Sequence, residues 1–477
     1  MVYKFSGFRD GHCHPLFAAR ESAGPNSDSC ETVDAVLEAL SGYLAANPDV
    51  PWVDAGSVDR NLSPNGQLNA TVLDTVSQTI PVIVHASDHH AIWVNTAALR
   101  VAGLEHSAPA VPNAHIDVDE SGKPTGMIHE WDAMNLVYVH QPKPSIEDDL
   151  AALHRAQNLL LANGVVAVQE AWIDPGMPEV YLAALERNEL VMRVNLAPRI
   201  APQSWQADLQ FAKATRSAVR AAGSPLLTCN TVKLFIDGVF GSETALLKEP
   251  YASGDCTNHG TAIWENEELL EFALAADSAG FQLHFHAIGD GAVSTALAAV
   301  RHVDDHNGFV DRRPVIAHAE LVSEAELLDL RKLGVVVCQQ PVWARPDSSH
   351  SETAAVLGEE RAAKLYPIAT LLGAGITVSF GSDWPVSLPN PLPGLYSAET
   401  RTAPELDVSL SLSEAVNRQQ ALYAYSVASA FQMGQETLLH EDWVEFDTNL
   451  ETCSPAELLE AKVLRVCVAG KVVDFTN

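Results

Sequence analysis

Short apolar runs recur along the chain, and most of them are followed by a stretch with the period of an amphipathic helix. Runs of about four to eight apolar residues bounded by Gly or Pro are typical of buried strands, whereas apolar residues spaced three or four apart are typical of helices. Strands are predicted at residues 7–12, 164–169, 191–197, 232–236, 281–286, 314–317, 334–338 and 375–380. Helices are predicted between them, at residues 146–162, 178–187, 266–279, 291–302, 323–333 and 359–372.

This alternation of strands and helices predicts the fold class. A helix between two strands carries the chain back along the sheet, so the strands run parallel. Eight parallel strands are the number that closes a (β/α)8 barrel, the TIM barrel. We therefore predict an α/β protein whose main domain is a TIM barrel.

A long segment, about residues 17–144, separates the first predicted strand from the second. It is rich in Pro, Asn, Gly and Asp, but it also holds a strand-like run at 81–85 and a helix-like stretch at 95–101. Loops of that length without structure of their own are uncommon in compact domains. We expect an inserted subdomain that lies over the mouth of the barrel.

The amino-acid composition restricts the cellular compartment and the classes of partner that we expect for this protein. Hydrophobic residues make up 47% of the 477 residues, enough for a large buried core, and the formal net charge is −32. A surface this negative repels phosphate backbones and anionic lipids, so we expect neither nucleic acid nor a membrane as a partner. The 7 cysteines form no paired motif, and the sequence has neither a signal peptide nor an apolar run of roughly 20 residues. These features predict a cytoplasmic protein.

Two histidine pairs stand where predicted strands end. His12 and His14 close the segment GFRDGHCHP. His284 and His286 stand in the segment FQLHFHAIGD. Side chains two apart on a strand face the same way, so each pair can converge on one metal ion. Taken singly, each pair has another explanation: unrelated surface histidines for the first, and hydrogen-bonded core histidines for the second.

Two single residues end further predicted strands. His318 ends the apolar run VIAH, and Asp383 follows the run VSFGS. Each has a structural alternative, His318 as a helix-entry residue and Asp383 as a helix or turn cap. The order of the motifs favours a site, however, because TIM-barrel active sites are assembled from the ends of several different strands.

Lys233 lies inside the apolar segment TVKLFIDG, where a bare ammonium group is costly unless it is paired. Burial lowers the pKa of a lysine, and a neutral amine can react with CO₂ to form a carbamate. A carbamate is an anion whose two oxygens can bridge two metal ions. The alternative is a lysine whose ammonium group reaches solvent or a carboxylate.

In order along the chain, the motifs GFxDxHxHP, KxFxDG, HxHAIGD, HAE and GSDWP resemble those of the amidohydrolase superfamily. They look most like the branch that contains N-substituted formamide deformylase, often called amidohydrolase family 3. The resemblance runs over about residues 5–433 and implies that this stretch forms a metal-dependent hydrolase barrel. As a set, the motifs are specific for the family and weak for the substrate.

The resemblance implies a centre of two metal ions. Its ligands would be His12, His14, Lys233, His286, His318 and Asp383. His12, His14 and Asp383 would bind one ion, His286 and His318 would bind the other, and a carboxylated Lys233 would bridge the two. Imidazole and oxygen ligands favour Zn²⁺, with manganese, iron or a single ion as alternatives.

Four further residues are predicted around the substrate. His284 stands two residues before His286 and is predicted to support the ligands or to contact the substrate. His90, Trp93 and Asn95, in the inserted segment, match a family motif and are predicted to line the pocket. Packing of the insertion is the alternative explanation for these three.

The implied reaction is hydrolysis of an amide or related C–N bond, other than a peptide bond, in a small molecule. Metal coordination lowers the pKa of a water to about 7 and polarises the carbonyl group. Asp383 would accept the proton of that water and pass it to the leaving nitrogen. A deaminase, an esterase or lactonase with the same site, and a non-catalytic ligand-binding barrel are the alternatives.

The C-terminal tail, residues 441–477, is predicted to be the remnant of a small β-sandwich. Apolar runs at 463–468 and 472–475 flank the turn sequence AGK, which predicts a hairpin outside the barrel. Family members usually begin some tens of residues earlier, with strands that complete this sandwich. We therefore expect the hairpin to have an unpaired edge, so that either two chains pair there as a homodimer or the recorded start is too late.

Overall fold

The computed structural model describes residues 1–27, 30–59, 62, 68–112, 114–254 and 257–475. The chain divides into two compact units. The main unit comprises residues 1–15 and 153–477, and the inserted unit comprises residues 16–152.

The main unit contains two parallel sheets, with strand orders β10-β9-β8-β2 and β11-β12-β13-β14-β15. The strands are β2 (Phe8–Cys13), β8 (Val165–Ile173), β9 (Arg193–Pro198), β10 (Leu227–Thr228), β11 (Thr231–Phe235), β12 (Gln282–Ala287), β13 (Val315–His318), β14 (Val336–Gln339) and β15 (Thr377–Phe380). All eight predicted strands are present, which confirms the parallel α/β class. The short β10 was not predicted.

Local contacts join the two parallel sheets at both of their sides. Arg199, just after β9, forms an isolated parallel bridge with Lys233 in β11. On the other side, the backbone N–H of Asp383, after β15, donates to the carbonyl of His12 in β2 at 2.7 Å. Gly381 approaches β2 so closely that a Cβ there would lie 2.7 Å from the backbone nitrogen of His12.

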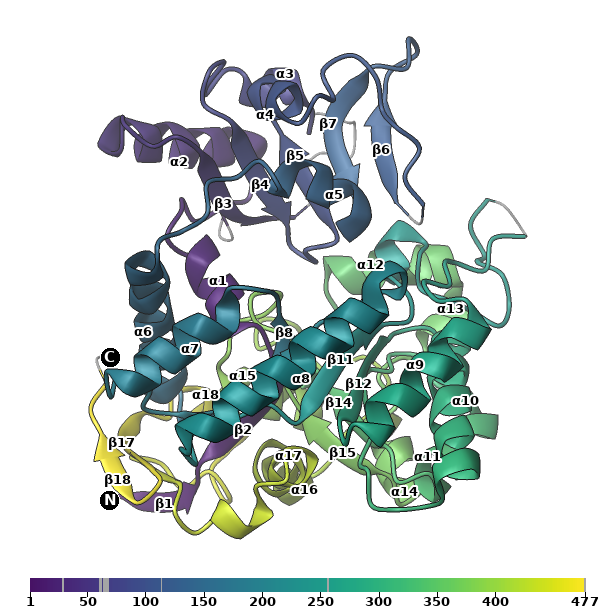
Figure 1. Ribbon diagram of the computed structural model, residues 1–477. Helices are drawn as coiled ribbons and strands as arrows, with labels where there is room; N and C mark the ends of the chain where they lie inside the picture. The colour runs from purple at the N-terminus through teal and green to yellow at the C-terminus, as the bar shows by residue number, and fades with distance from the viewer. Residues whose placement is uncertain (28–29, 60–61, 63–67, 113, 255–256, 476–477) are drawn as a thin grey trace. The chain divides into compact units, whose positions relative to one another are not determined.

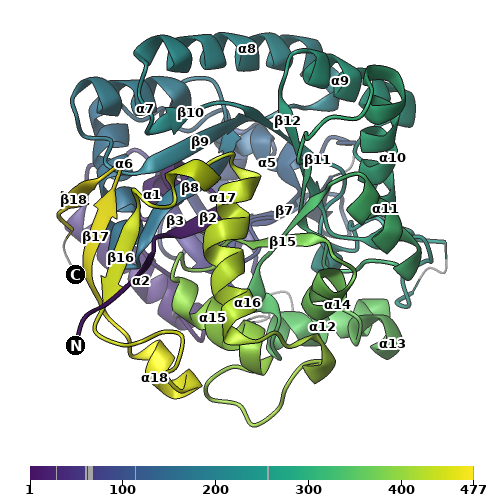
Figure 2. The ribbon, with the colours of Figure 1, turned by 90° about the horizontal axis from the view of Figure 1, so that it is seen from below.

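Helices separate the parallel strands, and Figure 2 shows α8, α9 and α10 on their outer side. The helices are α6 (Ile146–Ala162), α7 (Met177–Glu186), α8 (Trp205–Ala222), α9 (Asn266–Ser278), α10 (Asp290–Asn307), α11 (Leu327–Lys332), α12 (Ser348–Leu357), α13 (Glu359–Ala362), α14 (Ile368–Gly373), α15 (Pro391–Thr400), α16 (Arg418–Tyr423) and α17 (Ser429–Gln432). Across the described residues, none of the helices has the length and apolar character needed to cross a membrane.

One helix prediction needs correction, and a long helix was missed. The stretch 359–372 is two helices, α13 and α14, because Pro367 between them lacks the N–H that a continuous helix needs. Helix α8 was not predicted. Its buried residues recur with helical spacing, at Leu209, Ala212, Thr215 and Val219, so the pattern was available in the sequence.

A separate antiparallel sheet contains both ends of the described chain, with the strand order β1-β16-β17-β18. The strands are β1 (Tyr3–Ser6), β16 (Trp443–Phe446), β17 (Val463–Val468) and β18 (Lys471–Val473), and a short helix, α18 (Pro455–Leu459), precedes β17. The predicted hairpin is therefore confirmed as β17 and β18. The expectation of an unpaired edge is corrected for β17, which pairs with β16 in a sheet that the N-terminal strand β1 extends, whereas β18 is the last strand of this sheet among the described residues.

The inserted unit is a five-stranded sheet with helices on both faces (Figure 1). Its strands, in sheet order, are β3 (Val53–Val58), β4 (Val82–Ala86), β5 (Ala91–Val94), β7 (Pro124–His129) and β6 (His115–Val118). Its helices are α1 (Pro15–Glu21), α2 (Val33–Ala46), α3 (Ala70–Leu73), α4 (Thr96–Val101) and α5 (Trp131–Tyr138). The predicted strand at 81–85 and helix at 95–101 correspond to β4 and α4.

The alternating side chains of β4 explain why this unit has an apolar core on each face of its sheet. Val82 and Val84 belong to the apolar cluster that contains Leu40 of α2. Ile83, between them, belongs to the cluster that contains Met134 of α5. Because successive side chains on a strand point to opposite faces, one apolar strand supplies both cores.

Candidate metal centre

Strand β2 and the residue after it carry the first two predicted ligands. All residues of β2 are buried, and His12 is 0% exposed. His14 follows the strand directly and precedes Pro15, where α1 begins. Because side chains two apart on extended backbone point the same way, the His12 and His14 rings lie together, with centroids 5.2 Å apart.

His12 contacts three other predicted site residues. Its Nδ1 lies 2.7 Å from Nε2 of His284. Its Nε2 lies 3.2 Å from Nζ of Lys233 and 3.2 Å from Oδ1 of Asp383. The same Asp383 oxygen lies 3.0 Å from Nε2 of His14. Residues from β2, β11, β12 and the segment after β15 therefore meet at one place.

His318 connects this group to His286. The ring centroid of His318 lies 4.9 Å from that of His12 and 4.5 Å from that of His286. His12, His318 and Asp383 each offer a ligand atom, and these atoms all lie within 4.8 Å of one another. The six residues predicted as ligands are thus linked by short contacts around His12, and all six lie in the main unit.

Lys233 is 0% exposed within the apolar strand β11. Its Nζ contacts His12 and lies 4.6 Å from the ring centroid of Phe235. Burial lowers the pKa of Lys233 to about 7, although the charge of Asp383 acts in the opposite direction. A large fraction of this side chain is then a neutral amine near pH 7, and the neutral amine is the form that reacts with CO₂.

Burial and pairing set the charges of the other groups. Burial, together with the nearby Lys233, lowers the pKa of His12 and of His284 well below the usual value. Burial alone would raise the pKa of Asp383, but His12 and His14 hold it well below its usual range. The imidazoles of His12 and His284 are therefore neutral, and the Asp383 carboxylate is ionised. A neutral imidazole and an ionised carboxylate are the states that bind metal.

Asp10 fixes the segment that carries Asp383. Its Oδ1 accepts hydrogen bonds from the backbone N–H groups of His12 at 3.1 Å and Ser382 at 3.0 Å, and its Oδ2 accepts one from the Ser382 hydroxyl at 2.5 Å. Asp383 has a φ of 56°, a left-handed conformation that is strained for a residue other than glycine and needs such support. Asp10 belongs to the motif GFxDxHxHP, but the sequence interpretation assigned it no role.

Two more side chains that the sequence interpretation missed position the histidines. Oε1 of Gln340 lies 3.0 Å from Nδ1 of His318. Nε2 of His286 lies 3.2 Å from the carbonyl oxygen of Gly238. The neighbouring Asp237 lies 3.8 Å from the same nitrogen and accepts hydrogen bonds from two backbone N–H groups just after β12, so it fixes the segment around His286. Partners of this kind orient a metal-binding imidazole. The motif KxFxDG contains Asp237, whereas no motif marks Gln340.

The three residues predicted to line the pocket from the insertion belong to the inserted unit. Nδ1 of His90 lies 2.8 Å from Oε2 of Glu130. Nε1 of Trp93 donates to the carbonyl of Asn69 at 2.9 Å, and its ring is in the core of the unit. Asn95 is 0% exposed and caps α4, with its Oδ1 accepting a backbone hydrogen bond at 2.9 Å. The contacts of Trp93 and Asn95 are those expected from the packing alternative.

Comparison with known proteins decides the family. The model of the amidohydrolase family matches residues 5–474, nearly the whole chain. The chain belongs to the amidohydrolase family. The resemblance that the motifs carried is thereby confirmed, and this amidohydrolase is an enzyme, a metal-dependent hydrolase that acts on C–N bonds.

Relatives and solved structures span most of this amidohydrolase. It is 30% identical over 437 residues to "Protein LONG AFTER FAR-RED 3" of Arabidopsis thaliana, which covers 89% of the chain and 73% of the relative. It is 25% identical over 502 residues to an N-substituted formamide deformylase of Arthrobacter pascens, with 97% and 87% covered. The structure of an uncharacterized metal-dependent hydrolase from Pyrococcus horikoshii matches with a TM-score of 0.73 at 22% identity, covering 95% of this chain and 88% of the other. That structural match supports the fold.

Proposed function

We propose that this amidohydrolase hydrolyses an amide or related C–N bond, other than a peptide bond, in a small molecule. The observation that carries the proposal is the convergence of His12, Asp383 and their neighbours at the ends of different parallel strands. The similarity to N-substituted formamide deformylase makes a formamide the first substrate class to test. The predicted cytoplasmic location and homodimer stay predictions.

The proposal includes a (β/α)8 barrel that delivers the ligands. Its eight strands would be β2, β8, β9 and β11 to β15. The bridge between Arg199 and Lys233 supports contact of β9 with β11. The hydrogen bonds from Ser382 and Asp383 to β2 support contact of β15 with β2. In such a barrel the active site lies at the carboxyl ends of the strands, which is where the proposed ligands stand.

The donor set fits transition-metal ions. Imidazole nitrogens and carboxylate oxygens at short contact distances suit zinc. His12, His14 and Asp383 would hold one ion, and His286 and His318 would hold a second. Bound metal would supply an activated water and would polarise the scissile carbonyl.

Lys233 would complete the site as a carbamate. Its neutral Nζ would form a bond to the carbon of CO₂ as one C–O π bond of CO₂ breaks, and it would release one proton to solvent, which leaves an anion with two oxygens. The buried apolar strand around Nζ disfavours a permanent ammonium group. His284 would act as a positioning residue, because its bond to Nδ1 of His12 leaves Nε2 directed at Lys233 and Asp383.

Asp383 would move the proton during hydrolysis. Its carboxylate is ionised beside His12 and His14, so it can accept a proton from water. It would then deliver that proton to the nitrogen as the C–N bond breaks. A formamide would yield formate and an amine, whereas a deaminase acting on a ring would release ammonia.

The proposal is tested first with Asp383→Asn. The variant should keep most of its bound metal, because His12 and His14 remain, while kcat falls roughly 10²- to 10⁴-fold as general acid–base catalysis is lost. Metal content and the release of formate and ammonia from panels of formamides and ring amines are the measurements. Asp311→Asn, at a side chain that is 64% exposed, is the control and should leave both unchanged. Full activity of Asp383→Asn would disprove the role given to this carboxylate.

The bridging role of Lys233 is tested with Lys233→Met. Methionine fills a similar volume in an apolar strand but cannot form a carbamate, so the bound metal should fall from two ions per chain to one or fewer. Metal analysis of protein purified without chelators gives the number directly. Lys364→Met, at a side chain that is 62% exposed, is the control. Two ions per chain in Lys233→Met would rule out the carbamate bridge.

A further inference from the structure

The inserted unit contains a second group of buried side chains able to bind a metal ion. Glu21 ends α1, His85 lies in β4, and His89 lies in the turn between β4 and β5. Each offers one ligand atom, and the three atoms lie within 4.8 Å of one another. The residues are 7%, 2% and 5% exposed, respectively. None of them was part of the site predicted from the sequence, and all three belong to the inserted unit.

The contacts within this group leave one nitrogen unsatisfied. Nε2 of His89 lies 2.8 Å from Oε2 of Glu21. The rings of His85 and His89 stack, with centroids 5.4 Å apart and an interplanar angle of 26°. Nδ1 of His89 is buried and has no hydrogen-bond partner among the residues that the structure describes. Glu21 lies at the other ring nitrogen, Nε2, so Nδ1 can carry the ring proton of His89 and the lone pair of Nε2 is then free for an ion between the carboxylate and the second imidazole.

A second layer of polar groups holds His85 in place. Oδ1 of Asp54 lies 2.7 Å from Nε2 of His85, and the hydroxyl of Tyr138 lies 3.3 Å from its Nδ1. Gln141 in turn donates to the other oxygen of Asp54 at 3.0 Å. A carboxylate bonded to one ring nitrogen is the usual means of orienting a histidine that binds metal.

Aromatic rings pack around the group. The ring centroid of Phe17 lies 6.0 Å from that of His85 and 5.9 Å from that of His89. Trp131 contacts Phe17, and Tyr138 stacks on His85, each at 6.0 Å. An apolar shell of this kind limits the access of water and strengthens binding of an ion by its ligands.

We propose that Glu21, His85 and His89 bind a divalent transition-metal ion, Zn²⁺ by their chemistry, within the inserted unit. Two imidazoles and one carboxylate are a known zinc ligand set, and such a set leaves a fourth position for water or another ligand. On binding, the ion replaces the hydrogen bond between Nε2 of His89 and Glu21, and the ring proton of His89 is on Nδ1. The ion also replaces the Tyr138 hydroxyl at Nδ1 of His85 and releases one proton from that ring to solvent, because Asp54 and Glu21 raise the pKa of His85 to about 9 against the effect of burial. The alternative is a metal-free network in which Glu21 pairs with His89 and Asp54 pairs with His85.

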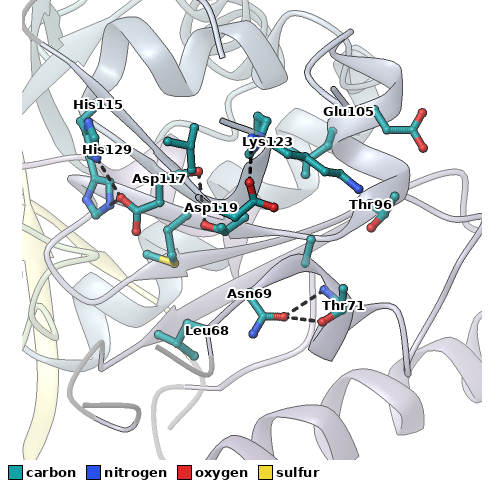
Figure 3. Close-up of a pocket in the computed structure, with 16 residues that line it drawn as sticks. Leu68, Asn69, Thr71, Thr96, Glu105, His115, Asp117, Asp119, Lys123 and His129 are labelled. Atoms are coloured by element: carbon teal, nitrogen blue, oxygen red, sulfur yellow. Dashed lines mark hydrogen bonds and ion pairs between the residues drawn. The ribbon is translucent and has the colours of Figure 1, made fainter. Parts of the chain in front are cut away.

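A neighbouring cluster in the same unit provides the matched control. His115 and His129 flank Asp117 at 3.1 and 3.2 Å, in a pocket of about 720 Å³ (Figure 3). The side chains of His115 and Asp117 are 69% and 42% exposed, so this cluster is far more solvated than the proposed site. Loss of His115 removes one histidine from the inserted unit without touching the buried group.

The test uses the full chain with the imidazole donors of the main unit removed by His12→Asn, His14→Asn, His286→Asn and His318→Asn together. This background is stripped of metal, incubated with Zn²⁺ alone and desalted, and its zinc content is measured. We expect about one Zn²⁺ per chain to remain, since the proposed site has its own three ligands. Adding Glu21→Gln or His89→Gln should remove that ion, while adding His115→Gln should not. Circular dichroism checks that each variant is folded.

Two further measurements test the proposal if a ligand variant fails to fold. Asp54→Asn keeps all three ligands and should weaken Zn²⁺ binding about 10- to 100-fold by releasing the orientation of His85. Zn²⁺ should also raise the melting temperature of the background chain, and Glu21→Gln should abolish that rise. Zinc content that is zero in the background, or that is lost with His115→Gln but kept with Glu21→Gln, would overturn the proposal.

Discussion

At the scale of single residues, a buried charge cluster joins distant parts of the main unit. Arg9, Arg193 and Asp442 are each 0% exposed. One oxygen of Asp442 lies 2.7 Å from Arg9 and 2.8 Å from Arg193, and the other accepts a hydrogen bond from the backbone N–H of Ala469. The cluster thus connects β2, β9 and the antiparallel sheet. No local pattern predicts it, because Arg9 and Asp442 are 433 residues apart.

Removing the shared carboxylate should strongly destabilise the protein. Asp442→Asn removes the carboxylate that two buried guanidinium groups share, although Arg193 still pairs with Glu441. Breaking a buried pair in this way typically costs about 3–5 kcal/mol. Urea unfolding measures the change. Glu441→Gln is the matched control: its side chain is 40% exposed and pairs with the same Arg193, so a loss of at most about 1 kcal/mol is expected. Equal losses in the two variants would contradict this account.

At the scale of secondary-structure elements, the contact between the end of β15 and β2 determines where Asp383 stands. Gly381 occupies the closest point of this contact. A Cβ at Gly381 would lie 2.7 Å from the backbone nitrogen of His12 and 3.0 Å from Oδ1 of Asp10. Neither atom belongs to a side-chain end that can move away freely, so the backbone of the segment would have to shift.

The substitution Gly381→Ala should therefore lower both stability and metal content. The clash displaces the backbone of His12 as well as the segment that carries Asp383, so two proposed ligands of the centre move at once. Gly373→Ala, in α14, is the control, because a Cβ there meets nothing within 4 Å. Alanine in a helix is favoured over glycine, so this control should be neutral or more stable by up to about 1 kcal/mol. Normal zinc content in Gly381→Ala would show that the close contact does not position the ligand.

At the scale of the whole molecule, the chain forms two compact units with separate cores. The inserted unit buries apolar side chains on both faces of its sheet, with Leu40 and Val84 on one face and Ile83 and Met134 on the other. A unit with its own core satisfies the main physical requirement for independent folding.

We expect residues 16–152 to fold when they are produced alone. Circular dichroism and a single cooperative thermal transition would show this. Val84→Asp places a charge at a position that is 0% exposed and should abolish the transition. Asp34→Asn, near the start of α2, should leave the transition almost unchanged. Absence of cooperative unfolding in the unmodified fragment would mean that its core is insufficient by itself.

Patterns among neighbouring residues were sufficient to predict the strands of the main unit. They were also sufficient to predict that the two histidines of a pair point to the same side of a strand. Strand periodicity is a property of neighbouring residues, so it placed His12 beside His14 and predicted all eight strands. The buried spacing of α8 was equally local and was overlooked. The motifs also identified the family, because their order along the chain is characteristic of it.

Contacts between distant residues depended on the fold. The pairing of β1 with β16, the support of Asp383 by Asp10 and the grouping of Glu21 with His85 and His89 join residues from 64 to 443 positions apart. Such contacts form only when packing of the whole core brings their elements together, and no sequence period encodes that arrangement. The sequence alone determines the chemical groups that each side chain offers, whereas packing of the folded core determines which residues those groups contact.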